Sequence, residues 1–404
     1  MILNIKPSEI KGETKAPSSK SMGHRLLICA GLAEGESKIG NILFSEDILA
    51  TLDCLEAMGA EIKRGDDSIS LVGTLPKMAV RNIYKCRESG STLRFFMPLA
   101  MLSENESIFE GYGRLMERPM EVYENIAKEK CIAYIKNADG ITVGGKLTSG
   151  NFKVPANISS QFISGLLFAL PLCDGDSEVQ LIGNIESRSY IDMTIYAMSL
   201  FGVDVSWKND TTLYIKGNQQ YKSRNLTVEG DYSNAAFLDA FNFIGGDVTV
   251  SGLDENSLQG DKIYKEYFSL LRQGNPTLDI KNCPDLAPIL MTLAAANNGC
   301  KLINTARLKI KESDRGVVMS EELSKFGADI EVYDNEIVVN KAELYRPKDD
   351  LYCHNDHRVV MSLVVLASKF GGRLVGTEAV KKSFPDFFDK VKALGLEFNS
   401  DDDK

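Results

Sequence analysis

The chain has 404 residues, of which 44% are hydrophobic, 25% charged and 8% aromatic, and its formal net charge is −10. This length suffices for two or three domains that each bury a core, and the composition excludes a mainly disordered or collagen-like protein. The negative charge argues against binding to nucleic acid or to anionic membranes, because such binding needs many Lys and Arg side chains. A small anionic ligand needs only a local basic cluster, so the negative net charge does not exclude it.

The eight cysteines are scattered, with no C-x-x-C pair, and there are only three histidines. This pattern predicts free thiols in a reducing cytoplasm and argues against a Cys/His zinc site. The N-terminus lacks a basic segment followed by an apolar one, and the longest apolar runs, such as residues 286–296, are far shorter than the roughly 18–20 residues that span a bilayer. We therefore expect a cytoplasmic protein that is neither secreted nor embedded in a membrane.

A unit consisting of an amphipathic helix, a glycine break and two short strands recurs along the chain. The clearest copies occupy residues 51–73, 196–217 and 320–340, and weaker copies surround Cys131, Gly274 and Gly395. The breaks at positions 59, 131, 202, 274, 327 and 395 are 72, 71, 72, 53 and 68 residues apart. Six such units predict helices that pack together and sheets that face outward, because one unit alone cannot cover its apolar faces. The alternative is that helices and hairpins alternate at this spacing by coincidence in an α/β enzyme without repeats.

The first predicted element is a strand at residues Ile2–Ile5. The sixth unit reaches Lys404 before its second strand. We therefore expect the N-terminal strand to complete this unit, which would place both termini in one domain.

Residues 15–35 combine a loop with a predicted helix start. Lys20 and Ser21 stand at the end of the loop, and Arg25 precedes the apolar run 26–32. Backbone N–H groups, the helix dipole and the two cations would attract an anion to this position. The alternative is an ordinary serine N-cap beside surface cations.

Two further segments place arginines near predicted helix starts. In residues 87–100, Gly90 precedes Arg94 and would allow the backbone to approach a ligand closely, although Ser-Gly-Ser is also a common helix entry. In residues 113–123, Arg114 and Arg118 are expected four apart on one side of a helix, and a solvent-exposed pair is the alternative.

The C-terminal half holds three polar segments with cations at predicted helix starts. Residues 307–311 alternate like a strand, with Lys309 and Lys311 on one face, and a helix is expected to begin near Ser313. The other two segments, 355–358 and 381–386, introduce two later helices. Cations in the first turn of a helix are repelled by the helix dipole and lower its stability. Because this cost recurs in three segments, a functional role for the cations is favoured.

Asp285 stands immediately before the apolar run 286–296, which has Pro288 in its predicted first turn. An aspartate in this position is commonly a helix N-cap. That interpretation is the alternative to a chemical role for Asp285.

Nine motifs occur in the order that is seen in the 5-enolpyruvylshikimate-3-phosphate (EPSP) synthase family of enolpyruvyl transferases. They are Lys20-Ser21-x-x-x-Arg25, Gly90-x-x-x-Arg94, Glu117-Arg118-Pro119, Ser159-Ser160-Gln161-Phe162, Ser187-x-x-Tyr190-Ile191-Asp192, Pro284-Asp285, Lys311-Glu312-Ser313-Asp314-Arg315, Asp356-His357-Arg358 and Lys382-Ser383-Phe384-Pro385-Asp386. From about residue 15 to residue 390, the chain resembles this family.

The resemblance implies a two-domain inside-out α/β barrel in which each domain is a threefold βαβαββ repeat. Residues 18–226 would form one domain, and residues 1–17 with 227–404 would form the other. The family transfers the enolpyruvyl group of phosphoenolpyruvate to the 5-hydroxyl of shikimate 3-phosphate and releases phosphate, in the shikimate pathway to aromatic amino acids. It needs no metal or organic cofactor. We expect a monomer whose domains close over the substrates.

The resemblance also implies roles for single residues. The contacts of shikimate 3-phosphate would be Lys20, Ser21, Arg25, Ser159, Ser160, Gln161, Ser187, Tyr190, Asp285 and Lys311. Phosphoenolpyruvate would contact Lys20, Gly90, Arg118, Gln161, Arg315, Arg358 and Lys382. Asp285 would accept the proton of the 5-hydroxyl, and Glu312 and Lys20 are both candidates for protonating the methylene carbon and for assisting phosphate departure. His357 stays outside this assignment.

Eight cations would then converge on one cleft, within a chain whose overall charge is negative. They are Lys20, Arg25, Arg94, Arg118, Lys311, Arg315, Arg358 and Lys382. Such a cluster suits two phosphorylated acids, because carboxylate and phosphate groups call for several Arg and Lys donors.

Four positions depart from the usual pattern of the family, and two other functions are alternatives. Ser18 follows Pro17 in place of Gly, Glu88-x-Gly90-Ser91 stands for Asn-x-Gly-Thr, and Phe95 stands for Pro. These changes leave the charged residues in place. One competing function is enolpyruvyl transfer to UDP-N-acetylglucosamine, but that enzyme relies on a loop Cys or Asp and lacks the Ser-Ser-Gln and Asp-His-Arg motifs. The other is a non-catalytic, anion-binding α/β repeat protein.

Overall fold

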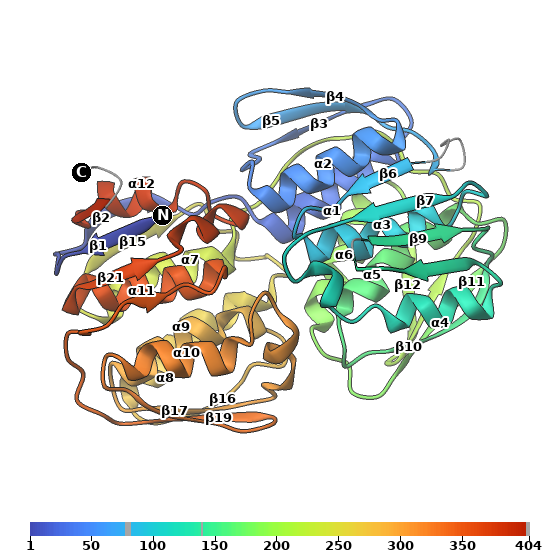
Figure 1. The fold of residues 1–404 in the computed structure, drawn as a ribbon. Helices are drawn as coiled ribbons and strands as arrows, with labels where there is room; N and C mark the ends of the chain where they lie inside the picture. Colours follow the sequence, from blue (N-terminus) through green and yellow to red (C-terminus); the bar gives the residue numbers. More distant parts are fainter. Residues whose placement is uncertain (77–81, 139, 401–404) are drawn as a thin grey trace. The chain divides into compact units, whose positions relative to one another are not determined.

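The computed structural model describes residues 1–76, 82–138 and 140–400, and the chain divides into two compact units (Figure 1). Unit 1 comprises Met1–Pro17 and Gly230–Lys404, and unit 2 comprises Ser18–Glu229. The second crossover lies between residues 229 and 230 rather than between 226 and 227. The reason is that Asn225–Thr227 forms a strand, β14, which pairs with a strand of unit 2.

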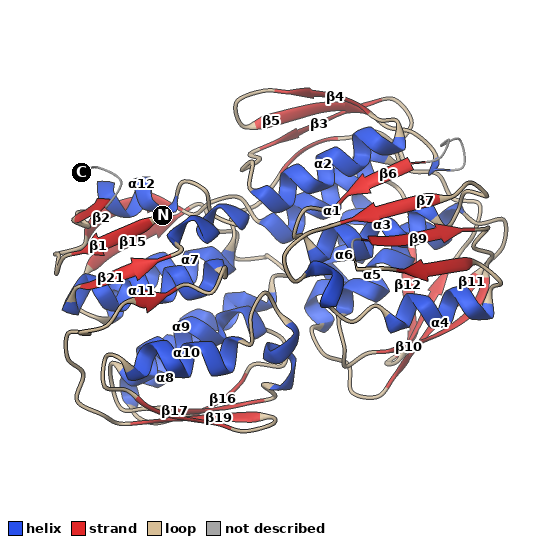
Figure 2. Ribbon diagram, in the orientation of Figure 1, coloured by secondary structure: helices blue, strands red, loops and turns tan. Residues whose placement is uncertain are grey.

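Unit 2 consists of three βαβαββ repeats (Figure 2). The first contains β14, α1 (Lys20–Gly31), β3 (Glu36–Gly40), α2 (Glu46–Met58), β4 (Glu61–Arg64) and β5 (Ser68–Val72). The second contains β6 (Asn82–Lys85), α3 (Gly90–Ala100), β7 (Ser107–Glu110), α4 (Glu121–Glu129), β8 (Ala133–Lys136) and β9 (Gly140–Gly144). The third contains β10 (Gly150–Pro155), α5 (Ser160–Ala169), β11 (Ser177–Ile182), α6 (Arg188–Leu200), β12 (Val205–Asn209) and β13 (Thr212–Ile215). Their sheets have the orders β14-β3-β5-β4, β6-β7-β9-β8 and β10-β11-β13-β12, and the first pair in each is parallel.

Unit 1 follows the same plan with one shortened repeat. That repeat contains β2 (Lys11–Lys15), α7 (Tyr232–Asp239), β15 (Asp247–Ser251) and α8 (Tyr264–Gln273). The next contains β16 (Thr277–Asp279), α9 (Ala287–Ala295), β17 (Cys300–Ile303), α10 (Arg315–Ser324), β18 (Asp329–Val332) and β19 (Glu336–Asn340). The last contains β20 (Leu351–Tyr352), α11 (His357–Phe370), β21 (Gly372–Val375), α12 (Phe387–Ala393), β22 (Phe398–Ser400) and β1 (Ile2–Ile5). The sheets have the orders β15-β2, β16-β17-β19-β18 and β20-β21-β1-β22.

Strand β1 completes the last sheet from the opposite end of the chain. Leu3 pairs with Leu374 of β21 on one side and with Ser400 of β22 on the other, both antiparallel. In the sheet order β1 takes the place that β19 has in the preceding sheet. This is the strand that the sequence predicts to be missing from the sixth unit.

The predicted unit around Gly274 lacks its strand pair, so this prediction is wrong. Helix α8 ends at Gln273, and the chain then enters β16, which belongs to the next sheet. Strand β15 is left paired with β2 alone. The missing hairpin accounts for the short spacing of 53 residues between Gly274 and Gly327.

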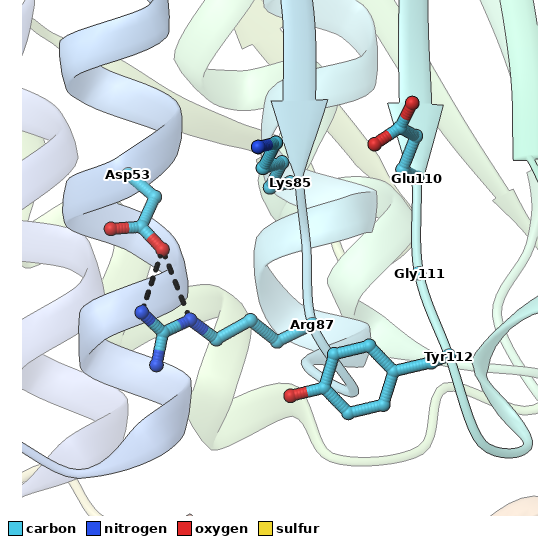
Figure 3. A pocket seen from close by; sticks show the side chains of 6 residues that line it. All are labelled: Asp53, Lys85, Arg87, Glu110, Gly111 and Tyr112. Atoms are coloured by element: carbon cyan, nitrogen blue, oxygen red, sulfur yellow. Dashed lines mark hydrogen bonds and ion pairs between the residues drawn. The ribbon is translucent and has the colours of Figure 1, made fainter.

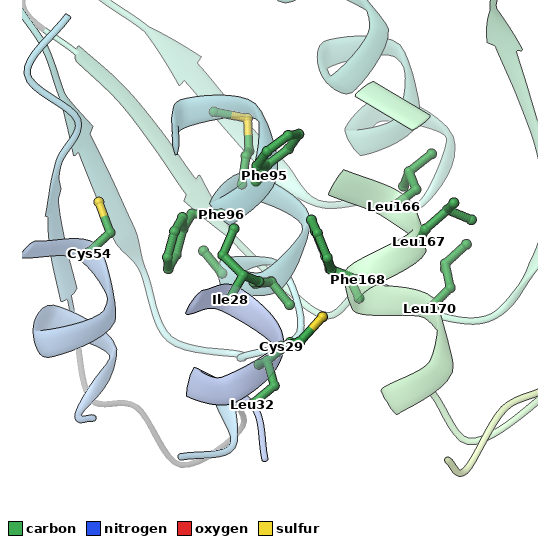
Figure 4. Close-up of a cluster of buried hydrophobic side chains, with 14 of the residues drawn as sticks. Ile28, Cys29, Leu32, Cys54, Phe95, Phe96, Leu166, Leu167, Phe168 and Leu170 are labelled. Carbon is green, nitrogen blue, oxygen red and sulfur yellow. The ribbon is translucent and has the colours of Figure 1, made fainter. Parts of the chain in front are cut away.

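The first helix of each repeat lies in the core. In α1, α3 and α5 nearly every residue is buried, whereas α2, α4 and α6 bury one face. Helices that are buried on all sides need cover on all sides, and the neighbouring helices and the sheets supply it together. Figure 4 shows Ile28 of α1, Phe95 of α3 and Phe168 of α5 in one buried cluster, and the two aromatic rings pack edge to face. The prediction of inward helices and outward sheets is confirmed, and each unit is an inside-out α/β barrel.

Helices α3 and α5 approach each other closely at Gly165. A Cβ at this position would lie 2.3 Å from the carbonyl oxygen of Arg94 and 2.2 Å from Tyr123 Oη. Tyr123 Oη is 2.7 Å from that same carbonyl oxygen and 3.0 Å from the carbonyl oxygen of Phe162. This close packing brings Arg94 of α3 beside the first turn of α5.

All eight cysteines are free thiols, and seven of them are buried. Among the residues that the structure describes, no helix is long and apolar enough to cross a bilayer.

Candidate functional site

The predicted site residues fall into two clusters, one in each unit. Unit 2 holds Lys20, Ser21, Arg25, Gly90, Arg94, Arg118, Ser159, Ser160, Gln161, Ser187 and Tyr190. Unit 1 holds Asp285, Lys311, Glu312, Arg315, Arg358 and Lys382.

In unit 2, helix α1 begins with a serine cap and a buried cation. Ser19 Oγ accepts a hydrogen bond from the backbone N–H of Met22, so the N-cap interpretation is correct for this residue. The same interpretation expected the cations beside this cap to lie on the surface, and that part is wrong. The Lys20 side chain is 14% exposed, and its Nζ lies 2.7 Å from Asp47 Oδ2.

Arg25 is buried, and neutral groups hold its guanidinium. Nε donates to Thr194 Oγ1 (2.8 Å), Nη1 to the carbonyl oxygen of Ser21 (2.6 Å) and Nη2 to the carbonyl oxygen of Tyr190 (2.9 Å). The rings of Phe95 and Tyr190 lie on its faces. Burial lowers the pKa of Arg25 to about 10, and no carboxylate among the described residues pairs with it. A buried cation without a counter-ion is costly, so this position suits an anionic ligand.

Arg94 and Gln161 form a hydrogen-bonded pair between α3 and α5. Arg94 Nη1 donates to Gln161 Oε1 (2.7 Å), and Nη2 donates to the carbonyl oxygen of Pro119 (3.2 Å). Gln161 Nε2 donates to Ser91 Oγ (2.8 Å). Ser159 caps α5 and accepts from the backbone N–H of Gln161 (3.3 Å). Both ends of the Gln161 amide are therefore fixed, which orients this side chain before any ligand arrives.

Gly90 is the first residue of α3, and the guanidinium of Arg118 lies directly over it. A Cβ on Gly90 would be 2.5 Å from Arg118 Nη1 and 3.5 Å from Arg94 Nη1. The absence of a side chain therefore lets the two arginines approach the backbone at the start of the helix.

Arg114 and Arg118 do not share a helical face, so that prediction is wrong. The residues between them form one 3-10 turn, η2 (Leu115–Glu117), and Arg118 is extended. The cause is Pro119, because a residue that precedes proline is driven out of the helical region. Arg114 is exposed and pairs with Glu117, whereas Arg118 is partly buried.

Ser160, Ser187 and Tyr190 lie at the starts of α5 and α6. Ser187 is buried in the left-handed conformation (φ 55°), and its carbonyl oxygen accepts from the backbone N–H of Tyr190. Together with Lys20 and Gly90, these residues stand at helix N-termini, where backbone N–H groups and the helix dipole favour anions.

In unit 1, the cluster is centred on Arg315, the first residue of α10, whose side chain is 1% exposed. Nε lies 2.8 Å from Asp356 Oδ2, Nη1 2.7 Å from Asp285 Oδ1 and Nη2 2.8 Å from Glu312 Oε2. Burial by itself would lower the pKa of Arg315, but the three carboxylates outweigh it and raise this pKa. Arg315 is a permanent cation that joins three acids.

Asp285 lies among three cations. Besides Arg315, Lys311 Nζ is 3.2 Å from its Oδ1, and Arg358 Nη2 is 3.6 Å from its Oδ2. Burial alone would raise the pKa of Asp285, but Lys311, Arg358 and Arg315 together hold it well below its usual range. The pKa of Lys311 is lowered as well, but here the main cause is burial, which outweighs the attraction of Asp285. Asp285 is therefore a carboxylate at neutral pH and, in this state, a weak base.

One alternative is excluded and one prediction fails in this region. The alternative that Asp285 is a helix cap is excluded, because Asp285 lies inside the 3-10 turn η6 (Pro284–Leu286) and its oxygens bind cations. Residues 307–311 form no strand, because Ala306–Ile310 is another 3-10 turn, η7, and α10 begins only at Arg315. The preceding strand, β17, already pairs with β16 and β19, so it offers no free edge to a further strand.

Asp356 connects Arg315 to the start of α11. It caps this helix by accepting from the backbone N–H of Arg358 (2.9 Å), and it also accepts from Ser313 Oγ (3.0 Å). Arg358 Nε and Nη1 are buried and have no hydrogen-bond partner among the described residues. Lys382 Nζ donates to the carbonyl oxygen of Asn355 (2.7 Å). His357, the first residue of α11, is buried.

Asp47 and Asp356 are the members of these clusters that the sequence interpretation did not assign. Asp47 is 27 positions from Lys20, and Asp356 is 41 positions from Arg315. Both lie at helix starts, where an acid is expected as a cap or a dipole partner. That preference could have predicted their presence, but it carries no information about which distant cation they bind.

A separate cavity of about 520 Å³ in unit 2 is lined by Asp53, Lys85, Arg87, Glu110, Gly111 and Tyr112 (Figure 3). None of these is a predicted site residue. Arg87 binds Asp53 there through Nε and Nη2. Within residues 1–76, 82–138 and 140–400, no group of His, Cys, Asp and Glu side chains is placed to hold a metal ion.

Comparison with known proteins places the chain among enolpyruvyl transferases. Residues 5–391 match the family model described as EPSP synthase (3-phosphoshikimate 1-carboxyvinyltransferase). The chain belongs to the EPSP synthase family. It is 40% identical to the 3-phosphoshikimate 1-carboxyvinyltransferase of Clostridium kluyveri, over 98% of both chains.

Two solved structures support the fold. The EPSP synthase of Acinetobacter baumannii has a TM-score of 0.78 and 23% sequence identity, with 99% of this chain and 100% of that chain covered. The enolpyruvyl transferase NikO of Streptomyces tendae has a TM-score of 0.79 and 13% identity, with 98% of each chain covered. At these identities the likeness concerns the fold, which the EPSP synthase family shares with another enolpyruvyl transferase.

The double role of Asp356 leads to a prediction about stability. Asp356→Ala removes a helix cap and also leaves the buried Arg315 without its Nε partner, so we expect a loss of about 3–5 kcal/mol in the free energy of unfolding. Asp314→Ala is the matched control, because Asp314 caps α10 by the same kind of bond but the structure pairs it with no buried arginine. It should cost only about 1 kcal/mol. Urea unfolding measures both, and equal losses would contradict the pairing of Asp356 with Arg315.

Proposed function

We propose that this chain transfers the enolpyruvyl group of phosphoenolpyruvate to the 5-hydroxyl of shikimate 3-phosphate, with release of inorganic phosphate. The observation that carries the proposal is the family match over residues 5–391, together with 40% identity to a 3-phosphoshikimate 1-carboxyvinyltransferase over 98% of both chains. The free thiols fit a reducing compartment, so we place the reaction in the cytoplasm.

The buried cations support the assignment of the anionic parts of the substrates. Arg25 carries its charge among hydroxyl, carbonyl and aromatic groups, and we assign it with Ser159, Ser160 and Gln161 to shikimate 3-phosphate. Arg358 has two buried nitrogen atoms, Nε and Nη1, that lack a partner among the described residues. We assign Arg358 with Lys382, Arg315 and Arg118 to phosphoenolpyruvate, because a carboxylate and a phosphate can both accept from such donors.

The remaining contacts follow from their places at helix starts. Ser21, Ser187 and Tyr190 belong to the shikimate 3-phosphate set, Gly90 belongs to the phosphoenolpyruvate set, and Lys20 belongs to both. Polar side chains and backbone N–H groups at these positions can hydrogen-bond to hydroxyl and phosphate oxygens. Asp285 and Lys311 complete the shikimate 3-phosphate set.

Asp285 is the residue that we assign as the general base for the 5-hydroxyl. In the ligand-free protein its proton affinity is low, because Lys311, Arg315 and Arg358 surround it. The same cations are assigned to substrates. Anions that bind to them draw their charge away from Asp285 and raise its pKa, so the carboxylate becomes a stronger base when the substrates are present.

Lys20 and Glu312 divide the remaining proton transfers according to their partners. Lys20, whose Nζ lies 2.7 Å from Asp47 Oδ2, is the residue that we assign to donate a proton to the methylene carbon of phosphoenolpyruvate as the 5-oxygen attacks the neighbouring carbon. Glu312 pairs with Arg315 and is a carboxylate, so it can take a proton back from the resulting methyl group as phosphate leaves. The proton lost by the 5-hydroxyl to Asp285 balances the proton that the departing phosphate takes up. The proton that Glu312 takes from the methyl group balances the one that Lys20 gave, so the sum of the two steps adds no proton to the protein and removes none.

A coupled phosphate-release assay tests the reaction. We expect the purified protein to release phosphate from phosphoenolpyruvate only when shikimate 3-phosphate is present. No release with both substrates at saturation, or release with UDP-N-acetylglucosamine as the acceptor, would refute the proposed function.

The role of Asp285 can be tested in the same assay. Asp285→Asn keeps the size of the side chain but removes the base, so we expect kcat to fall about 10²–10⁴-fold while both KM values change only modestly. Asp279→Asn is the control, because Asp279 is an exposed aspartate of the same unit that caps a local turn. A folded Asp285→Asn variant with a kcat near that of the wild type would exclude Asp285 as the base.

A further inference from the structure

Helix α10 carries a buried acid, Glu322, that takes part in none of the contacts assigned above. Glu322 is 2% exposed, and its carboxylate has three partners. Oε2 binds Lys325 Nζ (2.7 Å) and accepts from the backbone N–H of Tyr352 (2.8 Å), and Oε1 lies 3.1 Å from His354 Nε2. A buried carboxylate is stable only with such partners, so Glu322 holds the Lys325 side chain, the Tyr352 backbone and the His354 ring in place.

Glu322 and Arg315 tie one segment of chain to α10 at two places. They lie seven residues apart, which is about two helical turns, so they face the same side of the helix. Arg315 binds Asp356, and Glu322 binds Tyr352 and His354. Residues 352–356 are therefore attached to α10 at both of their ends.

The backbone between these attachments is in an uncommon conformation. His354 (φ 48°) and Asn355 (φ 52°) are both left-handed, which costs free energy for residues other than glycine and needs support from outside. The carbonyl oxygen of Asn355 accepts from Lys382 Nζ, and the next residue, Asp356, accepts from the backbone N–H of Arg358. The path of this backbone consequently sets where Lys382 and Arg358 lie.

We propose that Glu322 and His354 are positioning residues for phosphoenolpyruvate binding, because they hold the left-handed turn that fixes Lys382 and Arg358. This inference rests on the proposed function, which assigns these two cations to phosphoenolpyruvate. In the described part of the chain, Asp285 and Lys311, which are assigned to shikimate 3-phosphate in the same unit, form their ion pairs with Arg315, Arg358 and each other and not with Glu322 or His354. The two substrates should therefore respond differently when the support is removed.

Substitutions of the exposed His354 give the sharpest test. His354→Asn suits the left-handed backbone, since Asn tolerates this region well, but its side chain is too short to reach Glu322. We expect KM for phosphoenolpyruvate to rise about tenfold, as the loss of a hydrogen bond to a charged group implies, with KM for shikimate 3-phosphate within about twofold of wild type. His354→Gln, whose amide nitrogen can replace Nε2, should restore most of the loss.

Two more variants separate positioning from general stability. Lys325→Met removes another partner of Glu322 but keeps the two bonds from Glu322 to the backbone N–H of Tyr352 and to His354, so both KM values should stay near wild type. Glu322→Gln keeps the size of the side chain and loses its charge, and we expect KM for phosphoenolpyruvate to rise in the same direction as in His354→Asn. Thermal unfolding of each variant shows that the compared proteins are folded.

The outcomes distinguish the two proposals. Turnover by the wild type tests the proposed function, whereas the ratios between variants and wild type test the positioning role. The positioning role is overturned if neither His354→Asn nor Glu322→Gln raises KM for phosphoenolpyruvate, if both KM values rise together, or if Lys325→Met has the same effect as His354→Asn.

Discussion

The organisation of unit 1 depends on the cost of burying a guanidinium. Arg315 is almost completely removed from water, and such a cation is stable only when carboxylates surround it. Its three acids come from different segments: Asp285 from the turn before α9, Glu312 from the segment before α10, and Asp356 from the cap of α11. One buried cation therefore fixes the starts of the three helices α9, α10 and α11 relative to one another. The same contacts determine the proton affinity of Asp285, so stability and chemistry depend on one network.

Unit 2 also buries a guanidinium, that of Arg25, but surrounds it with neutral groups instead of carboxylates. The contacts of Arg25 are a hydroxyl group, two carbonyl oxygens and two aromatic faces, none of which cancels its charge. Burial lowers the pKa of Arg25, and an anionic ligand would relieve that cost. A chain with a net charge of −10 can thus recruit phosphorylated acids, because local burial of a few cations matters more to such ligands than the total charge.

Much of the fold could be predicted because its signals are local. Helices that are followed by glycine, and alternating strands, recur at a regular spacing, and the missing last strand pointed to Ile2–Ile5. The failures concern short segments whose structure depends on distant partners. Residues 307–311 alternate like a strand but form a 3-10 turn after β17, which already has a partner on both sides, and the hairpin expected after Gly274 is absent. Pro119, visible in the sequence, was enough to exclude the helical pair of Arg114 and Arg118.

The residue types of the site could be predicted from motifs, but their pairing could not. Lys20, Arg25, Asp285 and Arg315 were identified by their neighbours in the sequence. Their partners Thr194 and Asp356 come from other repeats, and Asp47 comes from another helix of the same repeat. No local pattern encodes those contacts. The role of Glu322 could not be predicted either, because in the sequence it is one more acid on an amphipathic helix. Only the structure shows its contacts with Tyr352 and His354.

The central claim is that the cations that suppress the proton affinity of Asp285 are also the cations that bind the substrates. NMR titration of the Asp285 carboxyl carbon, with the ligand-free protein and with the protein saturated with shikimate 3-phosphate, tests it directly. We predict a pKa well below the usual aspartate range in the free protein, because Lys311, Arg358 and Arg315 stabilise the carboxylate, and a clear rise when the ligand is bound. An ordinary pKa in the free protein, or one that does not move on saturation, would contradict the account.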